Sequence, residues 1–205
     1  MTRPARLALA LAAVSLMPGC AALGALGGGG PPRDAYELRG PLPGERPPAR
    51  TSLHVIVEPP IVTGALDTDR ILIRPNRLQA QYLPDGNWTD KPAEMLQAAL
   101  VRAIDGSGAF RYVGREPLGL GGDYALVTEI TDFQAEVGSD GRVTDRLRVS
   151  AKLVRESDVD VIAQRIFDVA VPVASSGTLD IVAALDGAMT AIVAQMTEWT
   201  VATLT

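Results

Sequence analysis

Cysteine and histidine are almost absent from this chain, which contains only Cys20 and His54. A structural zinc site needs several such ligands, and a Ser-His-Asp or Cys-His set needs a histidine beside its nucleophile. His54 instead falls in a stretch of alternating apolar residues, and Cys20 follows an apolar leader. With one cysteine, no internal disulfide can form. We therefore expect a protein that is not an enzyme and that holds no metal and no cofactor.

Long apolar runs and an excess of positive charge are also missing. Beyond the N-terminal leader, no segment has 18 consecutive apolar residues, which argues against a transmembrane helix. The chain has 19 Lys and Arg against 24 Asp and Glu, a formal charge of −5. A basic surface for nucleic acid is therefore not expected, and an acidic body is unsuited to lying on anionic headgroups.

The chain begins with a basic region that holds Arg3 and Arg6, followed by an apolar stretch at 7–16. This order, with an apolar stretch too short to span a bilayer, is the layout of a secretory signal peptide, and we assign residues 1–19 to it. Removal of the two arginines changes the formal charge of the mature chain to −7.

The leader ends in LMPGC, residues 16–20, which resembles the lipobox of bacterial lipoproteins, although Met17 stands where leucine is usual. The resemblance implies cleavage before Cys20 and fatty acylation of its thiol, with palmitate-type chains as the covalent lipid. Acyl chains anchor a protein by about 0.8 kcal/mol for each buried CH₂. Ala21, rather than aspartate, follows the cysteine and implies an address on the periplasmic face of the outer membrane.

Residues 20–50 read as the acylated N-terminus and a tether, because they contain a four-glycine run at 27–30 and several later prolines. Tyr36, Glu37 and Leu38 form a small apolar island within this stretch that can add an edge strand.

Residues 51–205 predict one α+β domain, a mostly antiparallel sheet with two helices packed on one face. Alternation predicts three strands joined by short turns at 124–137, 143–155 and 159–173, and shorter strands at 52–58, 71–74, 78–83 and 110–113. Asp85, Gly86 and Asn87 are typical turn residues. Leu147, Val149, Ala151 and Leu153 are expected to face the core, and Arg146, Arg148, Ser150 and Lys152 to face outward.

Two helices are expected, at 92–105 and 178–204. Pro92 suits a first helical turn. The second helix has apolar residues at spacings of three and four, from Val182 to Trp199. Such a stripe can form a coiled-coil seam or can lie across the sheet, and we favour the second because the sheet needs a cover.

The order and spacing of several segments resemble the ABC-type transport auxiliary lipoprotein family, the PqiC-like lipoproteins associated with MCE-type lipid transport. The segments follow the lipobox as AYEL at 35–38, LHVIVEPP at 53–60, DRILIRPNRLQAQYLPDGNWTDKP at 69–92, GAFRYVG at 108–114 and DYALVTEITDFQAE at 123–136. The positions nearest the family pattern are expected to be structural: Tyr36, Leu38, Tyr82, Trp88, Pro92, Tyr124 and Phe133.

The resemblance implies a non-catalytic outer-membrane subunit that docks or receives the conduit of a mammalian-cell-entry (MCE) type transporter. Its partners would be the periplasmic MCE-domain protein with its ABC permease and ATPase, and the chain could also form a homo-oligomer. Candidate contact surfaces are the outward residues Arg146, Arg148 and Lys152 and the loop 60–69, although an ordinary solvated surface is the favoured interpretation for any one residue. Two alternatives stay open: a lipoprotein of outer-membrane assembly or lipopolysaccharide export, and an envelope hydrolase of lipid or glycan, which predicts a deep polar pocket with a perturbed carboxylate.

Overall fold

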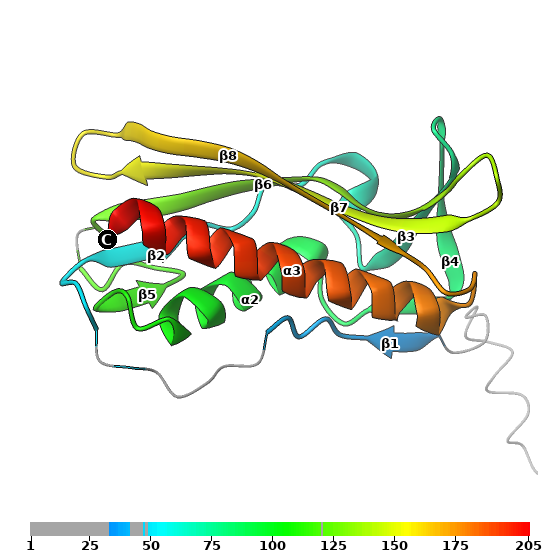
Figure 1. Ribbon diagram of the computed structural model, residues 1–205, viewed down its shortest axis with the longest axis horizontal. Helices are drawn as coiled ribbons and strands as arrows, with labels where there is room; N and C mark the ends of the chain where they lie inside the picture. Colours follow the sequence, from blue (N-terminus) through cyan, green and yellow to red (C-terminus); the bar gives the residue numbers. More distant parts are fainter. Residues whose placement is uncertain (1–32, 42–46, 48, 120) are drawn as a thin grey trace, which may run out of the picture. The chain divides into compact units, whose positions relative to one another are not determined.

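The computed structural model describes residues 33–41, 47, 49–119 and 121–205, and all features below belong to these residues. Cys20 and the signal peptide lie outside them. The described chain forms an α+β domain in which eight strands make one mixed sheet and two helices cover one of its faces (Figure 1). The predicted fold class is thus confirmed.

The sheet is built around three long antiparallel strands, β6 (Tyr124–Val137), β7 (Val143–Arg155) and β8 (Asp160–Pro172). Apolar side chains at every second position of β7 are buried, as the alternation predicted. The predicted meander is confirmed. Its bounds agree closely with the sequence because a clean period of two runs uninterrupted between turn residues.

Two short strands share the other edge of β6. The first half of β6 pairs in parallel with β2 (His54–Val57), and its second half pairs in parallel with β3 (Arg70–Asn76). β5 (Tyr112–Gly114) extends the sheet beyond β2, and β4 (Gln79–Trp88) pairs antiparallel with β3. A one-turn helix, η1 (Gly64–Leu66), lies in the connection between β2 and β3.

The sheet begins upstream of Thr51, with β1 (Asp34–Tyr36) as an edge strand parallel to β4. The apolar island predicted around Tyr36 therefore does pair with the sheet, and residues from Arg33 onward belong to the same compact unit as the rest of the domain. The expectation of a turn at Asp85–Asn87 was wrong, since this segment is part of β4 and pairs with β1. Gly86 allows the close approach: a Cβ there would lie 2.8 Å from the Tyr36 ring.

Both helices pack on the same face of the sheet and on each other. α2 (Pro92–Gly106) begins at the predicted proline, and Gly108, at φ +62°, follows its end in a conformation that favours glycine. α3 (Thr178–Leu204) lies across β7 and β8, as favoured above. Its length and apolar composition would also suit a membrane span. However, its predicted stripe is buried in this domain at Leu185, Met189, Ile192 and Met196 and partly buried at Val182 and Trp199, so it acts as a core helix.

Candidate interaction surface

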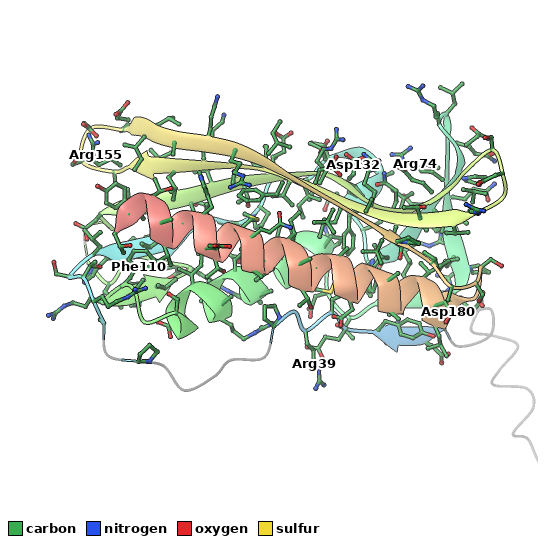
Figure 2. The ribbon with its side chains drawn as sticks, in the orientation of Figure 1. Arg39, Arg74, Phe110, Asp132, Arg155 and Asp180 are labelled. Carbon is green, nitrogen blue, oxygen red and sulfur yellow. The ribbon has the colours of Figure 1, made fainter. Side chains whose placement is uncertain are left out.

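The face of the sheet opposite α2 and α3 is not covered by a helix, and it carries the charged side chains of β6, β7 and β8. Figure 2 shows Arg74 and Asp132 on this side, away from α3. A β-bulge in β6 arranges the residues here. The pairing with β7 shifts between Ile130 and Asp132, so Thr131 is an extra residue. After the bulge, Phe133 and Ala135 face the core while Asp132, Gln134 and Glu136 point to the opposite face, where Gln134 is buried between its two neighbours.

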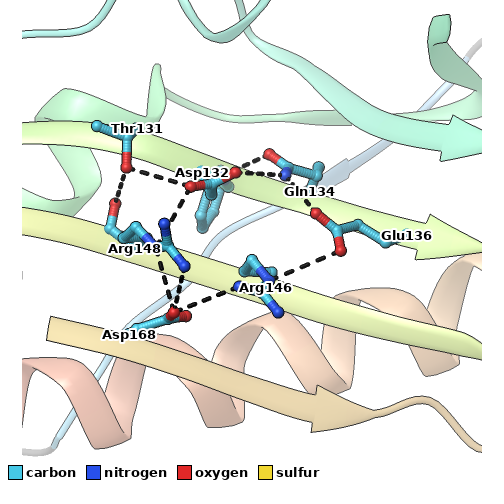
Figure 3. Close-up of polar contacts among 8 residues, drawn as sticks. Thr131, Asp132, Gln134, Glu136, Arg146, Arg148 and Asp168 are labelled. Carbon is cyan, nitrogen blue, oxygen red and sulfur yellow. Dashed lines mark hydrogen bonds and ion pairs between the residues drawn. The ribbon is translucent and has the colours of Figure 1, made fainter. Parts of the chain in front are cut away.

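Six side chains from three strands form a closed polar ring on this face (Figure 3). The Gln134 amide donates to Asp132 and Glu136, at 2.9 Å each. Arg146 pairs with Glu136 at 3.6 Å and Asp168 at 3.3 Å, and Arg148 pairs with Asp168 at 2.5 Å and Asp132 at 3.7 Å. The hydrogen bond and charge of Asp168 raise the pKa of Arg148 above its usual value. The ring, called the polar ring below, holds two guanidiniums and three carboxylates.

The polar ring forms part of the floor of a groove of about 1070 Å³. The β3 end and the β3–β4 turn supply one wall, with Arg74, Pro75, Asn76 and Arg77, and the β6–β7 turn supplies another, with Gly138 and Ser139. Arg74 and Arg77 have no carboxylate within ion-pair distance in the described part of the chain. The groove therefore combines a floor whose charges are mutually paired with two unpaired cations on its wall.

The sequence-predicted surface residues fall into two groups. Arg146 and Arg148 do face outward, but both are held in the polar ring, so the sequence missed their partners Asp132, Gln134, Glu136 and Asp168. Lys152 is exposed on the same face, between Val127 of β6 and Gln164 of β8. The loop 60–69 runs along the β6 edge, where Ile61 pairs with Glu129, and Asp67 forms a 2.7 Å ion pair with Lys91, the N-cap residue of α2.

The positions nearest the family pattern lie mostly in or against the core. Leu38, Trp88, Pro92 and Phe133 are buried, and the Trp88 and Phe133 rings pack with centroids 5.5 Å apart. The Tyr82 hydroxyl donates to the Ala65 carbonyl at 3.1 Å. Tyr36 lies on β1, where partial burial and then Asp34 raise its pKa. Tyr124 opens β6 opposite Arg155, and a hydrogen bond between their side chains raises the pKa of Arg155.

Comparison with known proteins identifies the family. The family model described as the ABC-type transport auxiliary lipoprotein component matches residues 36–197. The chain belongs to this family. Members are auxiliary parts of ABC-type transport rather than a class of enzymes, and they are envelope lipoproteins associated with a membrane. Among the described residues, no group of three or more His, Cys, Asp or Glu side chains is placed to hold a metal ion.

Two solved structures share the fold of this auxiliary lipoprotein. The crystal structure of protein XCC0632 from Xanthomonas campestris is 26% identical, with a TM-score of 0.74, over 82% of this chain and 95% of that chain. A crystal structure of an uncharacterized protein is 17% identical, with a TM-score of 0.65, over 83% of this chain and 99% of that chain, and it shows the fold alone. No curated protein matches the sequence.

Proposed function

We propose that this auxiliary lipoprotein is a non-catalytic outer-membrane subunit of an MCE-type ABC lipid transport system. In this role it is anchored through the acylated Cys20 on the periplasmic face, and it docks or receives the far end of the periplasmic MCE-domain conduit. The family supports the transport role, and the lipobox and Ala21 support the anchor and its address. The observation that carries the docking role is the sheet face that no helix covers in the described domain.

The docking surface is best placed on β7 and β8, beyond the polar ring. Arg146 and Arg148 are already paired with Asp168 in the polar ring, so fewer of their donors are free to bind a partner. Ile166 of β8, by contrast, is 68% exposed and lies diagonally from Lys152 on the outer face. An exposed apolar side chain beside an unpaired cation is suited to the centre of an interface, because burying its apolar surface is favourable and breaks no ion pair.

Recovery of the partner from membranes tests this proposal. The full-length chain with a C-terminal tag is purified from mild detergent, and the recovered MCE-domain protein is identified by mass spectrometry. Ile166→Glu combined with Lys152→Glu should remove most of the recovered MCE-domain protein. The matched control is Leu179→Glu on α3, because Leu179 is 70% exposed but lies on a helix rather than on the sheet face.

Recovery of the MCE-domain protein by the wild type and the Leu179→Glu control, but not by the double variant, supports both the role and the surface. Equal recovery of the MCE-domain protein by all three chains would mean that it docks elsewhere than on this face. If the wild type recovers other envelope complexes and no MCE-domain protein, the transport role itself is contradicted.

A further inference from the structure

The tip of the β3–β4 hairpin is a tight turn that exposes an apolar side chain. The Asn76 amide donates to the Gln79 side-chain oxygen at 3.0 Å, and the Leu78 N–H donates to the Asn76 side-chain oxygen at 3.0 Å. These bonds fix Arg77 and Leu78 as the two central residues of the turn. Leu78 is 98% exposed, so none of its apolar surface contributes to the core. The turn therefore keeps the Leu78 side chain exposed to solvent at a fixed position on the surface.

The same tip carries positive charge on an acidic protein. Arg74 and Arg77 line the wall of the groove and have no carboxylate partner within the described residues, whereas the nearby carboxylates Asp132 and Glu136 are committed to the polar ring. Two unpaired guanidiniums at one place favour an anionic group, and their fork of donors fits phosphate oxygens. We call Arg74, Arg77 and Leu78 the hairpin tip.

The anchored segment enters the domain along β4, the strand that follows the hairpin tip. β1 runs parallel to β4, with Asp34 opposite Gly86, and Arg33 donates from its Nε to the Pro84 carbonyl at 3.0 Å. The amino end of β1 is directed toward the tip, and since Pro84 is six residues beyond Leu78, the chain enters roughly 20 Å along β4 from the tip. The segment from Cys20 to the start of the described domain runs over the thirteen residues 20–32. Thirteen residues reach at most about 45 Å when extended and roughly 20 Å as a flexible coil.

We propose that the hairpin tip is a contact with the bilayer in which the protein is anchored. In this contact, Arg74 and Arg77 bind the phosphates of phospholipid headgroups, and Leu78 enters the boundary between headgroups and acyl chains. The inference rests on the anchoring through Cys20 that forms part of the proposed function. A cluster of only two cations and one leucine binds a membrane weakly when the protein is free, which agrees with the net negative charge of the body.

The anchor makes a weak contact effective. A short tether holds the domain at an effective concentration of about millimolar relative to the membrane, so weak binding can still set its orientation. With the hairpin tip on the lipid, the β7–β8 turn at the other end of the sheet points away from the membrane (Figure 1). The contact would thus orient the uncovered sheet face for a partner that arrives from the periplasm.

Site-specific coupling to vesicles tests the contact. Cys20 is the only cysteine, so a chain starting at Cys20 can be joined by its thiol to a maleimide lipid in vesicles of phosphatidylcholine and phosphatidylglycerol. Leu78→Trp places an indole at the hairpin tip, and brominated phosphatidylcholine in the vesicles quenches an indole that enters the bilayer. The matched control is Leu118→Trp, because Leu118 is 70% exposed in the loop between β5 and β6, which leads to Tyr124 opposite Arg155 beside the β7–β8 turn. Emission from the native Trp88 and Trp199 is subtracted with the coupled wild type.

The expected result is loss of most of the introduced emission for Leu78→Trp and little loss for Leu118→Trp. Adding Arg74→Gln and Arg77→Gln to Leu78→Trp should restore the emission, with circular dichroism showing that the fold is kept. Equal quenching at positions 78 and 118 overturns the proposal. Quenching at position 78 that is unchanged by Arg74→Gln and Arg77→Gln overturns it as well. The coupling is chemical and no partner is present, so a negative result here leaves the recovery of the MCE-domain protein unaffected, and the reverse also holds.

Discussion

Asp145 is a carboxylic acid buried in the core without a partner. It lies on the core-facing side of β7, in register with Ala135 of β6 and Val171 of β8, and its exposed fraction is 0%. Neither carboxylate oxygen accepts a hydrogen bond. Because burial disfavours the charged form, it raises the pKa of Asp145 from 3.8 to about 8.

The raised pKa makes the protein less stable as pH increases. The folded state favours the protonated acid, so the contribution of Asp145 is most favourable below pH 4 and is lost as pH rises from about 4 to about 8. Each pKa unit corresponds to 1.36 kcal/mol, which gives a loss of up to about 4 kcal/mol at pH 7. That is a large part of a typical total stability of about 5–15 kcal/mol.

The test is Asp145→Asn, which keeps the shape of the side chain and removes the charge. Urea unfolding of the variant and the wild type is measured from pH 4 to pH 8. We expect the free energy of unfolding of the variant, relative to the wild type, to rise by about 1.4 kcal/mol per pH unit across this window. The difference between variant and wild type at pH 4 is the internal reference, because Asp145 of the folded wild type is then neutral. A difference that stays constant with pH would refute the argument from burial.

Three further outcomes follow from the sequence and the contacts. Cys20→Ser should move the protein from the membrane to the soluble fraction, with an unchanged circular dichroism spectrum; a variant that stays on the membrane would reveal another anchor. Phe133→Ala should reduce the free energy of unfolding by about 3–5 kcal/mol in urea titration, because it removes a buried ring that packs on Trp88; a loss below about 1 kcal/mol would contradict that packing. Asp168→Ala should cost less than about 1 kcal/mol, since its pairs with Arg146 and Arg148 are partly exposed, and a much larger cost would mean that the polar ring holds the sheet together.

Regular patterns made the long elements predictable. The expected strands at 124–137 and 143–155 and the expected helix at 178–204 have the bounds of β6, β7 and α3. In each of these elements, apolar residues recur at a constant spacing from one turn to the next, so local sequence and tertiary packing agree. The short strands were less well placed, because pairing with distant segments decides where they end.

Three features could not be predicted because they depart from the regular sequence pattern. Asp85–Asn87 has turn composition, yet pairing with β1 and the close approach at Gly86 hold it in β4. The bulge at Thr131 changes which residues of β6 face outward, so the alternation gave no sign that Asp132 and Glu136 would meet the arginines of β7. Asp145 shares the inward phase of Leu147, but a charged residue gives no apolar signal, so its burial was visible only in the structure.

Mass spectrometry of the native N-terminus tests most directly whether this chain is a membrane-anchored transport lipoprotein. The protein is purified from the membranes of its natural host, and its N-terminal peptide is measured intact. A peptide that begins at Cys20 and carries the added mass of fatty acyl chains is the predicted result. A chain that still begins at Met1, with a free thiol on Cys20, would contradict both the anchor and the compartment in which the proposed transporter partner is found.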